Sequence, residues 1–266
     1  MTYKPKYYLI IALILSVFTV FGQSETSFKS TYAYQNGEYL KYRVHYGFMN
    51  AGYVTLKLNQ TKKNGYDVFH AKGLGWTSGA AKIFFDLNDR YESYFTVGNN
   101  IKPIHFIRRV DENGYILQRD LTFDYHTNKV KVEDFKKKTT EYYSFNDVQD
   151  MVSVLYHLRN IDINNIKPSD IVNIDMFFDG ETFPFKLRFE GKEVLNTKFG
   201  KVRTWRIQPM VQKGRFFEDQ ESLTMWISDD ANKVPILIKA SLVVGSIKAD
   251  LDHYYGLGHT LAIVND

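Results

Sequence analysis

The feature that most constrains the fold is a regular alternation of apolar and polar side chains in short runs. In EYLKYRVHY, residues 38–46, every second side chain from Leu40 to Tyr46 is apolar and those between are basic or polar. This period of two is typical of a β-strand with one buried face. The apolar set is Leu40, Tyr42, Val44 and Tyr46, and the other set is Lys41, Arg43 and His45. A chain built from such runs must bury one face of a sheet.

Turn residues separate these runs and join them into hairpins. Asn64-Gly65 and Asn113-Gly114 are pairs that two-residue hairpin turns prefer. The chain also has 20 Phe, 19 Tyr and 3 Trp, and aromatic residues favour strands. We therefore predict a mainly β protein, with a large curved antiparallel sheet or an open or closed barrel and one or two covering helices. No side-chain pattern recurs at a fixed period of about 20 to 50 residues, which argues against a propeller or a solenoid.

The N-terminus has the pattern of a signal peptide. Lys4 and Lys6 precede the apolar run YYLIIALILSVFTVF, residues 7–21, and Gly22 follows it. A transmembrane anchor is the alternative, but the run has 15 residues and a spanning helix needs about 20. We expect residues 1–22 to be removed before Gln23. The mature chain is then expected to be soluble, without a transmembrane segment, and periplasmic or extracellular.

The remaining residues, 23–266, are predicted to form a single β-rich domain, because no linker-like stretch divides them. The chain has no cysteine, which excludes disulfides, thiolate metal sites and a lipid-modified cysteine. Without Lys4 and Lys6, 32 basic and 30 acidic residues leave a net charge of +2. That balance gives no argument for a nucleic-acid partner. The lysines at 136–138 are interpreted as a solvated hairpin tip rather than a binding patch.

One segment has a helical period. In NDVQDMVSVLYHLRNI, residues 146–161, apolar residues recur at steps of three and four, which predicts an amphipathic helix packed on the sheet. We expect Asn146 or Asp147 to cap it and Arg159 to lie near its C-terminal end. His157 is expected on the exposed side. The predicted buried stripe is Val148, Met151, Val152, Leu155 and Leu158.

The stretch WISDDANKVPI, residues 226–236, resembles a site because oxygen-bearing side chains are concentrated in it. Asp229, Asp230 and Asn232 could contribute to a calcium shell, but the spacing lacks the alternating ligands and final glutamate of a calcium loop. Short polar residues followed by Pro235 are typical of a turn between two strands. We predict a turn, no metal site, and a change of at most about 1 kcal/mol for Asp230→Asn.

A glycine-rich segment, FHAKGLGWTSGAAKIFFDL, is the candidate ligand-binding region. Its small residues let a ligand approach the backbone, so it could form a lip over an apolar interior. The predicted ligand-binding residues are Trp76, Gly79, Phe84 and Phe85. The alternative is a glycine-punctuated strand with a bulge, followed by a short helix.

No catalytic residue or cofactor is predicted. The seven histidines are scattered, without the spacing that places two metal ligands on one face, and no G-x-S-x-G elbow occurs. The hairpin RRVDENGYILQR gathers Arg108, Arg109, Asp111, Glu112 and Arg119, which we interpret as charges that support strand pairing. A polar sugar or peptide site is the alternative there.

An ordered set of segments carries a family resemblance. It comprises GEYLKYRVHYGFMNAG, DRYESYF, IHFIRRVDENGY, DVQDMVSVLYHLR, FGKVRTWRIQP and WISDDANKVPILIKASLVVGSIKADL. The set resembles the secreted bacterial family known as domain of unknown function 3108, over residues 37–251. The FGQ that follows the apolar run resembles the Bacteroidetes branch. The family implies no activity, and its architecture is similar to the curved sheets of periplasmic lipoprotein carriers, an analogy of fold alone.

Three functions stay open. The first is a soluble periplasmic binding module that holds or carries an apolar or amphipathic envelope molecule, such as a lipid. The second is a structural or interaction protein that contacts other envelope proteins and has a filled core. The third is an enzyme acting on envelope material. A deep apolar cavity would favour the first, a solid core the second, and titratable groups clustered in a cleft the third.

Overall fold

The computed structural model describes residues 32–210, 222–243 and 245–264, and the predicted signal peptide lies outside them. The helices in this part of the chain are α2 (Ala81–Phe84) and α3 (Ser153–Asn160). The strands are β1 (Tyr39–Tyr46), β2 (Met49–Lys63), β3 (Tyr66–Thr77), β4 (Asn88–Thr96), β5 (Pro103–Glu112), β6 (Tyr115–Asp124), β7 (Lys129–Asp134), β8 (Thr139–Ser144), β9 (Ile171–Phe178), β10 (Glu181–Thr197), β11 (Gly200–Met210), β12 (Leu223–Ser228), β13 (Pro235–Ser241), β14 (Ser246–Tyr255) and β15 (Ile263–Val264).

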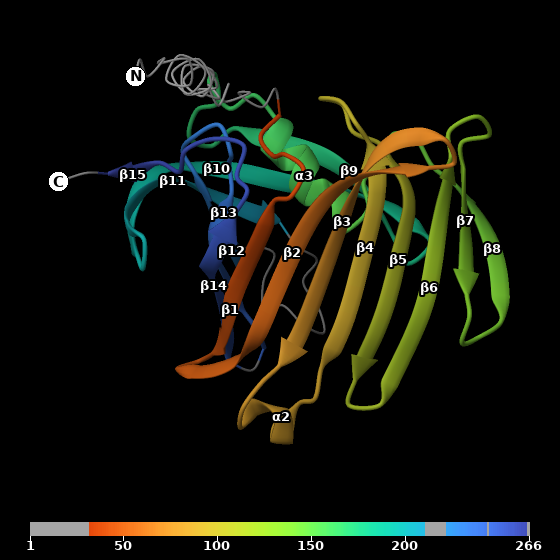
Figure 1. Ribbon diagram of the computed structural model, residues 1–266, viewed down its shortest axis with the longest axis horizontal. Helices are drawn as coiled ribbons and strands as arrows, with labels where there is room; N and C mark the ends of the chain where they lie inside the picture. Colours follow the sequence, from red (N-terminus) through yellow and green to blue (C-terminus); the bar gives the residue numbers. More distant parts are fainter. Residues whose placement is uncertain (1–31, 211–221, 244, 265–266) are drawn as a thin grey trace, which may run out of the picture.

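The strands form one antiparallel sheet, which curves around α3 (Figure 1). Its order is β8-β7-β6-β5-β4-β3-β2-β1-β14-β13-β12-β11-β10-β9, and β15 pairs with β11. The strands at the two ends, β8 and β9, are not paired with each other, so the sheet is open over the described residues. The predicted fold class, a large curved antiparallel sheet with few helices, is confirmed.

Antiparallel pairing places successive turns at opposite ends of the sheet. We call the end that carries the β1–β2, β5–β6, β7–β8 and β13–β14 turns and α2 the lower rim. The end beside α3 is the upper rim (Figure 1). The predicted Asn-Gly pairs form turns, with φ of 52° and 84° at Asn64 and Gly65 and of 49° and 83° at Asn113 and Gly114. Positive φ at both central residues is the geometry that these hairpin turns require.

Helix α3 is shorter and more deeply buried than predicted. It begins at Ser153, and the residues before it run beside β9, where Gln149 N–H donates to Asp175 O at 2.8 Å. Neither Asn146 nor Asp147 caps it. Instead Asp150 Oδ1 accepts hydrogen bonds from the N–H groups of Val152 and Ser153, each at 2.8 Å. Burial raises the pKa of Asp150 to about 6, against the effect of these bonds.

The faces of α3 also differ from the prediction. Val154, Tyr156, Leu158 and Arg159 are buried, whereas Leu155 is half-buried. His157 is half-buried rather than exposed. The helix lies inside the curve of the sheet (Figure 1). Its side chains belong to both core clusters, so they are packed on more than one side of the helix.

Aromatic side chains fill the concave side of the sheet around α3. The Tyr34 ring lies 5.0 Å from the Tyr156 ring, and Phe95 lies 5.3 Å from Tyr156, measured between centroids. A second cluster, with Leu187, Phe189 and others, packs on the other side of α3. The upper half of the interior is therefore a packed core.

Within the described ranges, no helix is both long enough and apolar enough to cross a membrane.

Candidate functional site

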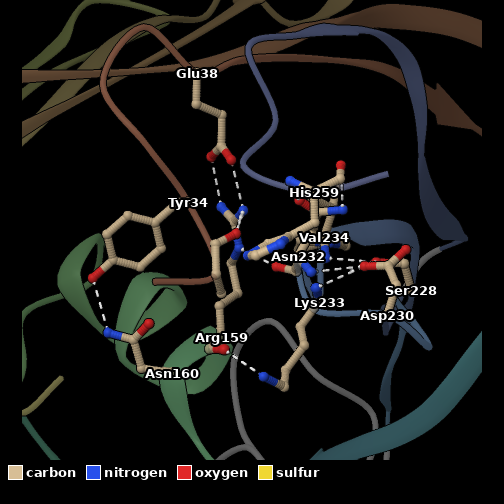
Figure 2. A network of polar contacts seen from close by, with 12 residues as sticks. Tyr34, Glu38, Arg159, Asn160, Ser228, Asp230, Asn232, Lys233, Val234 and His259 are labelled. Atoms are coloured by element: carbon tan, nitrogen blue, oxygen red, sulfur yellow. Dashed lines mark hydrogen bonds and ion pairs between the residues drawn. The ribbon is translucent and has the colours of Figure 1, made fainter. Parts of the chain in front are cut away.

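The acidic stretch at residues 226–236 forms the turn between β12 and β13, as predicted. Asp230 Oδ1 accepts hydrogen bonds from the Asn232 N–H at 2.8 Å and the Ser228 hydroxyl at 2.9 Å (Figure 2). Asp230 Oδ2 accepts a hydrogen bond from the Ala262 N–H at 2.7 Å. This carboxylate therefore shapes the turn and also fixes the C-terminal segment to it.

A buried ion pair lies beside this turn. Arg159 donates to both carboxylate oxygens of Glu38 at 2.6 Å, and the two side chains are 3% and 1% exposed (Figure 2). Arg159 also donates to the carbonyl oxygens of Ala33 at 2.9 Å and Asn232 at 2.8 Å. Burial alone would lower the pKa of Arg159. The neighbouring Glu38 carboxylate has the larger effect and raises this pKa above the ordinary guanidinium value.

Asn232 connects the ion pair to the C-terminal segment. Its side chain accepts a hydrogen bond from the His259 N–H at 2.8 Å and donates to the His259 carbonyl at 2.9 Å. Lys233 Nζ donates to the Arg159 carbonyl at 3.0 Å, at the end of α3 (Figure 2). Among the described residues, no three His, Asp or Glu side chains gather as metal ligands. The network joins three distant segments, and we assign it a structural role.

The hydrogen bonds of Asp230 change the expected effect of its substitution. Both oxygens accept hydrogen bonds, so the NH₂ group of an asparagine would face a donor on one side. Asp230→Asn is expected to lower the free energy of unfolding by about 1–3 kcal/mol, more than the sequence predicted. Urea denaturation measures this change.

Asp229→Asn is the matched control. The Asp229 side chain pairs with Lys192 at 3.0 Å, and Lys192 is 56% exposed. Such pairs contribute about 0–1 kcal/mol. Equal effects of the two substitutions would show that the hydrogen bonds of Asp230 contribute little.

A cleft of about 180 Å³ lies where the two ends of the sheet approach each other. The β9–β10 turn forms one wall, and an added Cβ at Gly180 would come within 2.9 Å of the Tyr143 ring on β8. The other walls come from β5, β6, β7 and β8. Its apolar lining residues are Phe106, Leu121, Val132, Phe177 and Phe178, and its ionisable ones are Arg108, Arg119, Asp134, Lys137, Glu141, Tyr143 and Asp179.

Two arginines face each other in this cleft. Arg108 and Arg119 are directly opposite in the β5–β6 register, a placement of like charges that is unfavourable unless it is compensated. Asp179 Oδ1 accepts from both, at 3.0 Å from Arg108 and 2.8 Å from Arg119. The Arg108 guanidinium lies 4.9 Å from the Phe178 ring centroid, and its buried Nε has no hydrogen-bond partner among the described residues.

The two aspartates of the cleft differ in how firmly they are held. Asp134 is 7% exposed and accepts hydrogen bonds from Arg119 Nε at 2.9 Å and the Lys137 N–H at 2.9 Å. Burial alone would raise the pKa of Asp134, but these donors outweigh burial and hold that pKa below its usual range. Asp179 is 47% exposed and lies at a hairpin tip. An incoming anion can therefore displace Asp179 more easily than Asp134.

The predicted ligand-binding residues do not line the cleft. Trp76 is the second-last residue of β3 and contacts Tyr53, with ring centroids 5.9 Å apart. Gly79 lies in the turn before α2, with a φ of 60°. Phe84 and Phe85 are 79% and 42% exposed. All four lie at or near the lower rim, and their role in ligand binding stays a prediction.

The sequence indicates only part of the cleft. The charges of the hairpin with Arg108 and Arg119 are apparent from it. It gives no direct sign that Asp134, Lys137 and Asp179 join these arginines. The available signal was the Asp179-Gly180 pair, which marks a tight turn and so places a carboxylate at a strand end.

A solved structure shares this architecture. It is described as "Crystal Structure of Beta-barrel-like Protein of Domain of Unknown Function DUF1849 from Brucella abortus", and it superimposes with a TM-score of 0.56. The identity is 9%, and the match covers 84% of this chain and 98% of the other. At that identity the likeness concerns the fold alone.

The sequence comparisons give the family. A comparison with curated proteins gave no match. The family described as "Protein of unknown function (DUF3108)" matches residues 41–252, which include the segments that carried the resemblance except residues 37–40 of the first. The Bacteroidetes assignment stays a prediction. The chain therefore belongs to the DUF3108 family.

Proposed function

We propose that this protein is a binding module of the bacterial cell envelope whose cleft holds the anionic end of an amphipathic molecule. The observation that carries the proposal is the pair of opposed arginines beside apolar walls. Within the described part of the chain, Arg108 Nε has no hydrogen-bond partner. A carboxylate or phosphate ester would accept hydrogen bonds from both guanidinium groups in place of Asp179. The walls formed by Phe106, Leu121 and Phe177 suit the adjoining alkyl part.

The size of the cleft limits the ligand. Its volume of about 180 Å³ is below the roughly 300–1,000 Å³ of pockets that enclose a drug-sized molecule. The core around α3 leaves the upper half of the interior filled. We therefore propose that the protein holds a head group or a short chain rather than enclosing a whole lipid.

The packed interior favours a second function, a structural or interaction protein of the envelope that takes no small ligand. An enzyme is less well supported. A general acid in the cleft would need a raised carboxyl pKa, whereas the pKa of Asp134 is lowered. The periplasmic or extracellular location is part of the proposal and rests on the signal-peptide pattern of residues 1–22.

Titration calorimetry with decanoate, and with decylammonium as its cationic counterpart, tests the proposal. We expect decanoate to bind saturably and decylammonium not to bind. Arg108→Gln should weaken decanoate binding about ten- to hundredfold, because a hydrogen bond to a charged group contributes about 1.5–3 kcal/mol.

Arg109→Gln is the matched control. Arg109 is the next residue on β5, pairs with Asp120 at 2.6 Å, and does not line the cleft. Its substitution should leave decanoate binding unchanged. Absence of saturable decanoate binding to the wild type, with the protein folded, would reject the proposal and favour the structural role. Equal losses in the two variants would reject the role of Arg108.

A further inference from the structure

Three neighbouring tips at the lower rim form a continuous surface, which we call the apolar rim. They are the β1–β2 turn at residues 46–49, the segment with α2 at 79–85, and the described part of the β13–β14 turn at 241–243 and 245–247. The Gly47 N–H donates to Ser246 O at 3.0 Å, and the Ser78 N–H donates to Ala51 O at 3.0 Å. These bonds hold the first tip between the other two. Figure 1 shows the β1–β2 turn and α2 at the end of the sheet away from α3.

The side chains of the apolar rim are exposed to an unusual degree for their size. Phe48 is 97% exposed, Ile83 is 83% and Phe84 is 79%. Helix α2 buries none of its own residues. Lys82 is the one charged residue in the sequence of the three tips. Contiguous exposed apolar side chains mark a surface that contacts something else.

Charged residues continue the same end of the sheet. The α2 segment is tied to the β5–β6 turn, where the Asn113 N–H donates to Asp86 O at 2.8 Å. Further along the rim, the β7–β8 turn carries Phe135, which is 49% exposed, and then the exposed lysines 136–138. Among the described residues, Lys136 and Lys138 have no ion-pair partner. Asp111 and Glu112 lie beside the intervening β5–β6 turn, and the three exposed lysines of the β7–β8 turn outnumber them. Apolar tips and a lysine-rich turn at the same end of the sheet suit an anionic surface of low polarity.

We propose that the apolar rim docks on a bilayer surface that contains anionic phospholipid. Phe48, Ile83 and Phe84 would enter the boundary between head groups and acyl chains, and the lysines at 136–138 would meet the lipid phosphates. A second copy of this chain is a poorer occupant, because it would bring the same lysines to the contact. Separate protruding tips also suit a deformable bilayer better than a rigid protein surface.

The proposal is independent of the cleft function, but the two surfaces adjoin. Lys137 belongs to the β7–β8 turn and also lines the cleft. A protein docked by the apolar rim would therefore hold the cleft close to the lipid head groups. This placement would suit a ligand taken from the membrane.

Vesicle co-sedimentation of the secreted form, predicted to begin near Gln23, tests the docking. The probes are vesicles of phosphatidylcholine, with and without phosphatidylglycerol. We expect binding only with phosphatidylglycerol, and a loss of at least about tenfold for the double variant Phe48→Ser and Phe84→Ser. The double charge reversal Lys136→Glu and Lys138→Glu should also abolish the binding. Thermal unfolding should be unchanged, because all four side chains are exposed.

Tyr66→Ser is the matched control. Tyr66 is 71% exposed but lies at the upper rim, beside the β2–β3 turn. Its substitution should leave vesicle binding unchanged. Failure of the wild type to bind anionic vesicles, or an equal loss for Tyr66→Ser, would overturn the proposal. So would sedimentation showing a wild-type oligomer that Phe48→Ser dissociates, because the apolar rim would then be a protein contact.

The same variants separate the two proposals. The Phe48→Ser and Phe84→Ser variant should bind decanoate as the wild type does, and Arg108→Gln should bind vesicles as the wild type does. Loss of vesicle binding in Arg108→Gln would show that the cleft, rather than the apolar rim, holds the lipid, and would overturn the docking proposal.

Discussion

Replacement of Glu38 by methionine is expected to lower the free energy of unfolding by about 3–5 kcal/mol, the largest effect that we predict for one side chain. The substitution leaves the Arg159 guanidinium, 3% exposed, without its carboxylate. An uncompensated buried charge has lost its hydration and gains little in return. Urea denaturation of the single variant measures the change.

The double variant shows how much of this effect is the unpaired charge. Arg159→Met alone should also be strongly destabilising, because it leaves the Glu38 carboxylate buried. Both substitutions together should cost clearly less than the sum of the two, since no buried charge remains. Asp67→Asn is the control. Asp67 is 62% exposed and its ion-pair partner Lys62 is 72% exposed, and such a pair contributes about 0–1 kcal/mol. If the double variant lost as much stability as the sum of the two single variants, the two charges would not stabilise each other.

Local patterns predicted much of this fold because local chemistry determines it. The alternation in residues 38–46 and the Asn-Gly pairs act over a few residues, and the strands and turns that they predict are present. The start of α3 was predicted too early because Gln149 pairs with β9 instead of continuing the helix. No pattern within residues 146–161 reveals that competing partner.

The candidate sites were harder to predict because their partners are distant in sequence. Arg159 matched a helix-end cation, but its partner Glu38 is 121 residues away. Arg108 and Arg119 were visible as hairpin charges, yet Asp179 is 71 and 60 residues from them. The concave side of the sheet brings these groups together, and its curvature depends on packing across the whole sheet. The charge pattern of one segment gives no information on that geometry.

The buried faces of α3 give the second large effect. Leu158→Ala is expected to lower the free energy of unfolding by about 2–5 kcal/mol, because Leu158 is 3% exposed and belongs to the cluster with Leu187 and Phe189. Leu155→Ala should cost less, because Leu155 is half-buried and the void left by its truncation opens toward solvent. Chemical denaturation of both variants gives the ranking.

His157→Ala extends the comparison to a half-buried polar residue of the same helix. His157 is half-buried, and burial lowers its pKa, so the imidazole is neutral near pH 7 and its loss removes no ion pair. Its substitution should cost less than that of Leu158. An amphipathic helix on the outside of a sheet would place Leu155 and Leu158 together on the buried side, and their truncations would then cost the same. A larger cost for Leu158 is expected because Leu158 is buried and Leu155 is only half-buried, so equal costs would contradict this orientation of the helix.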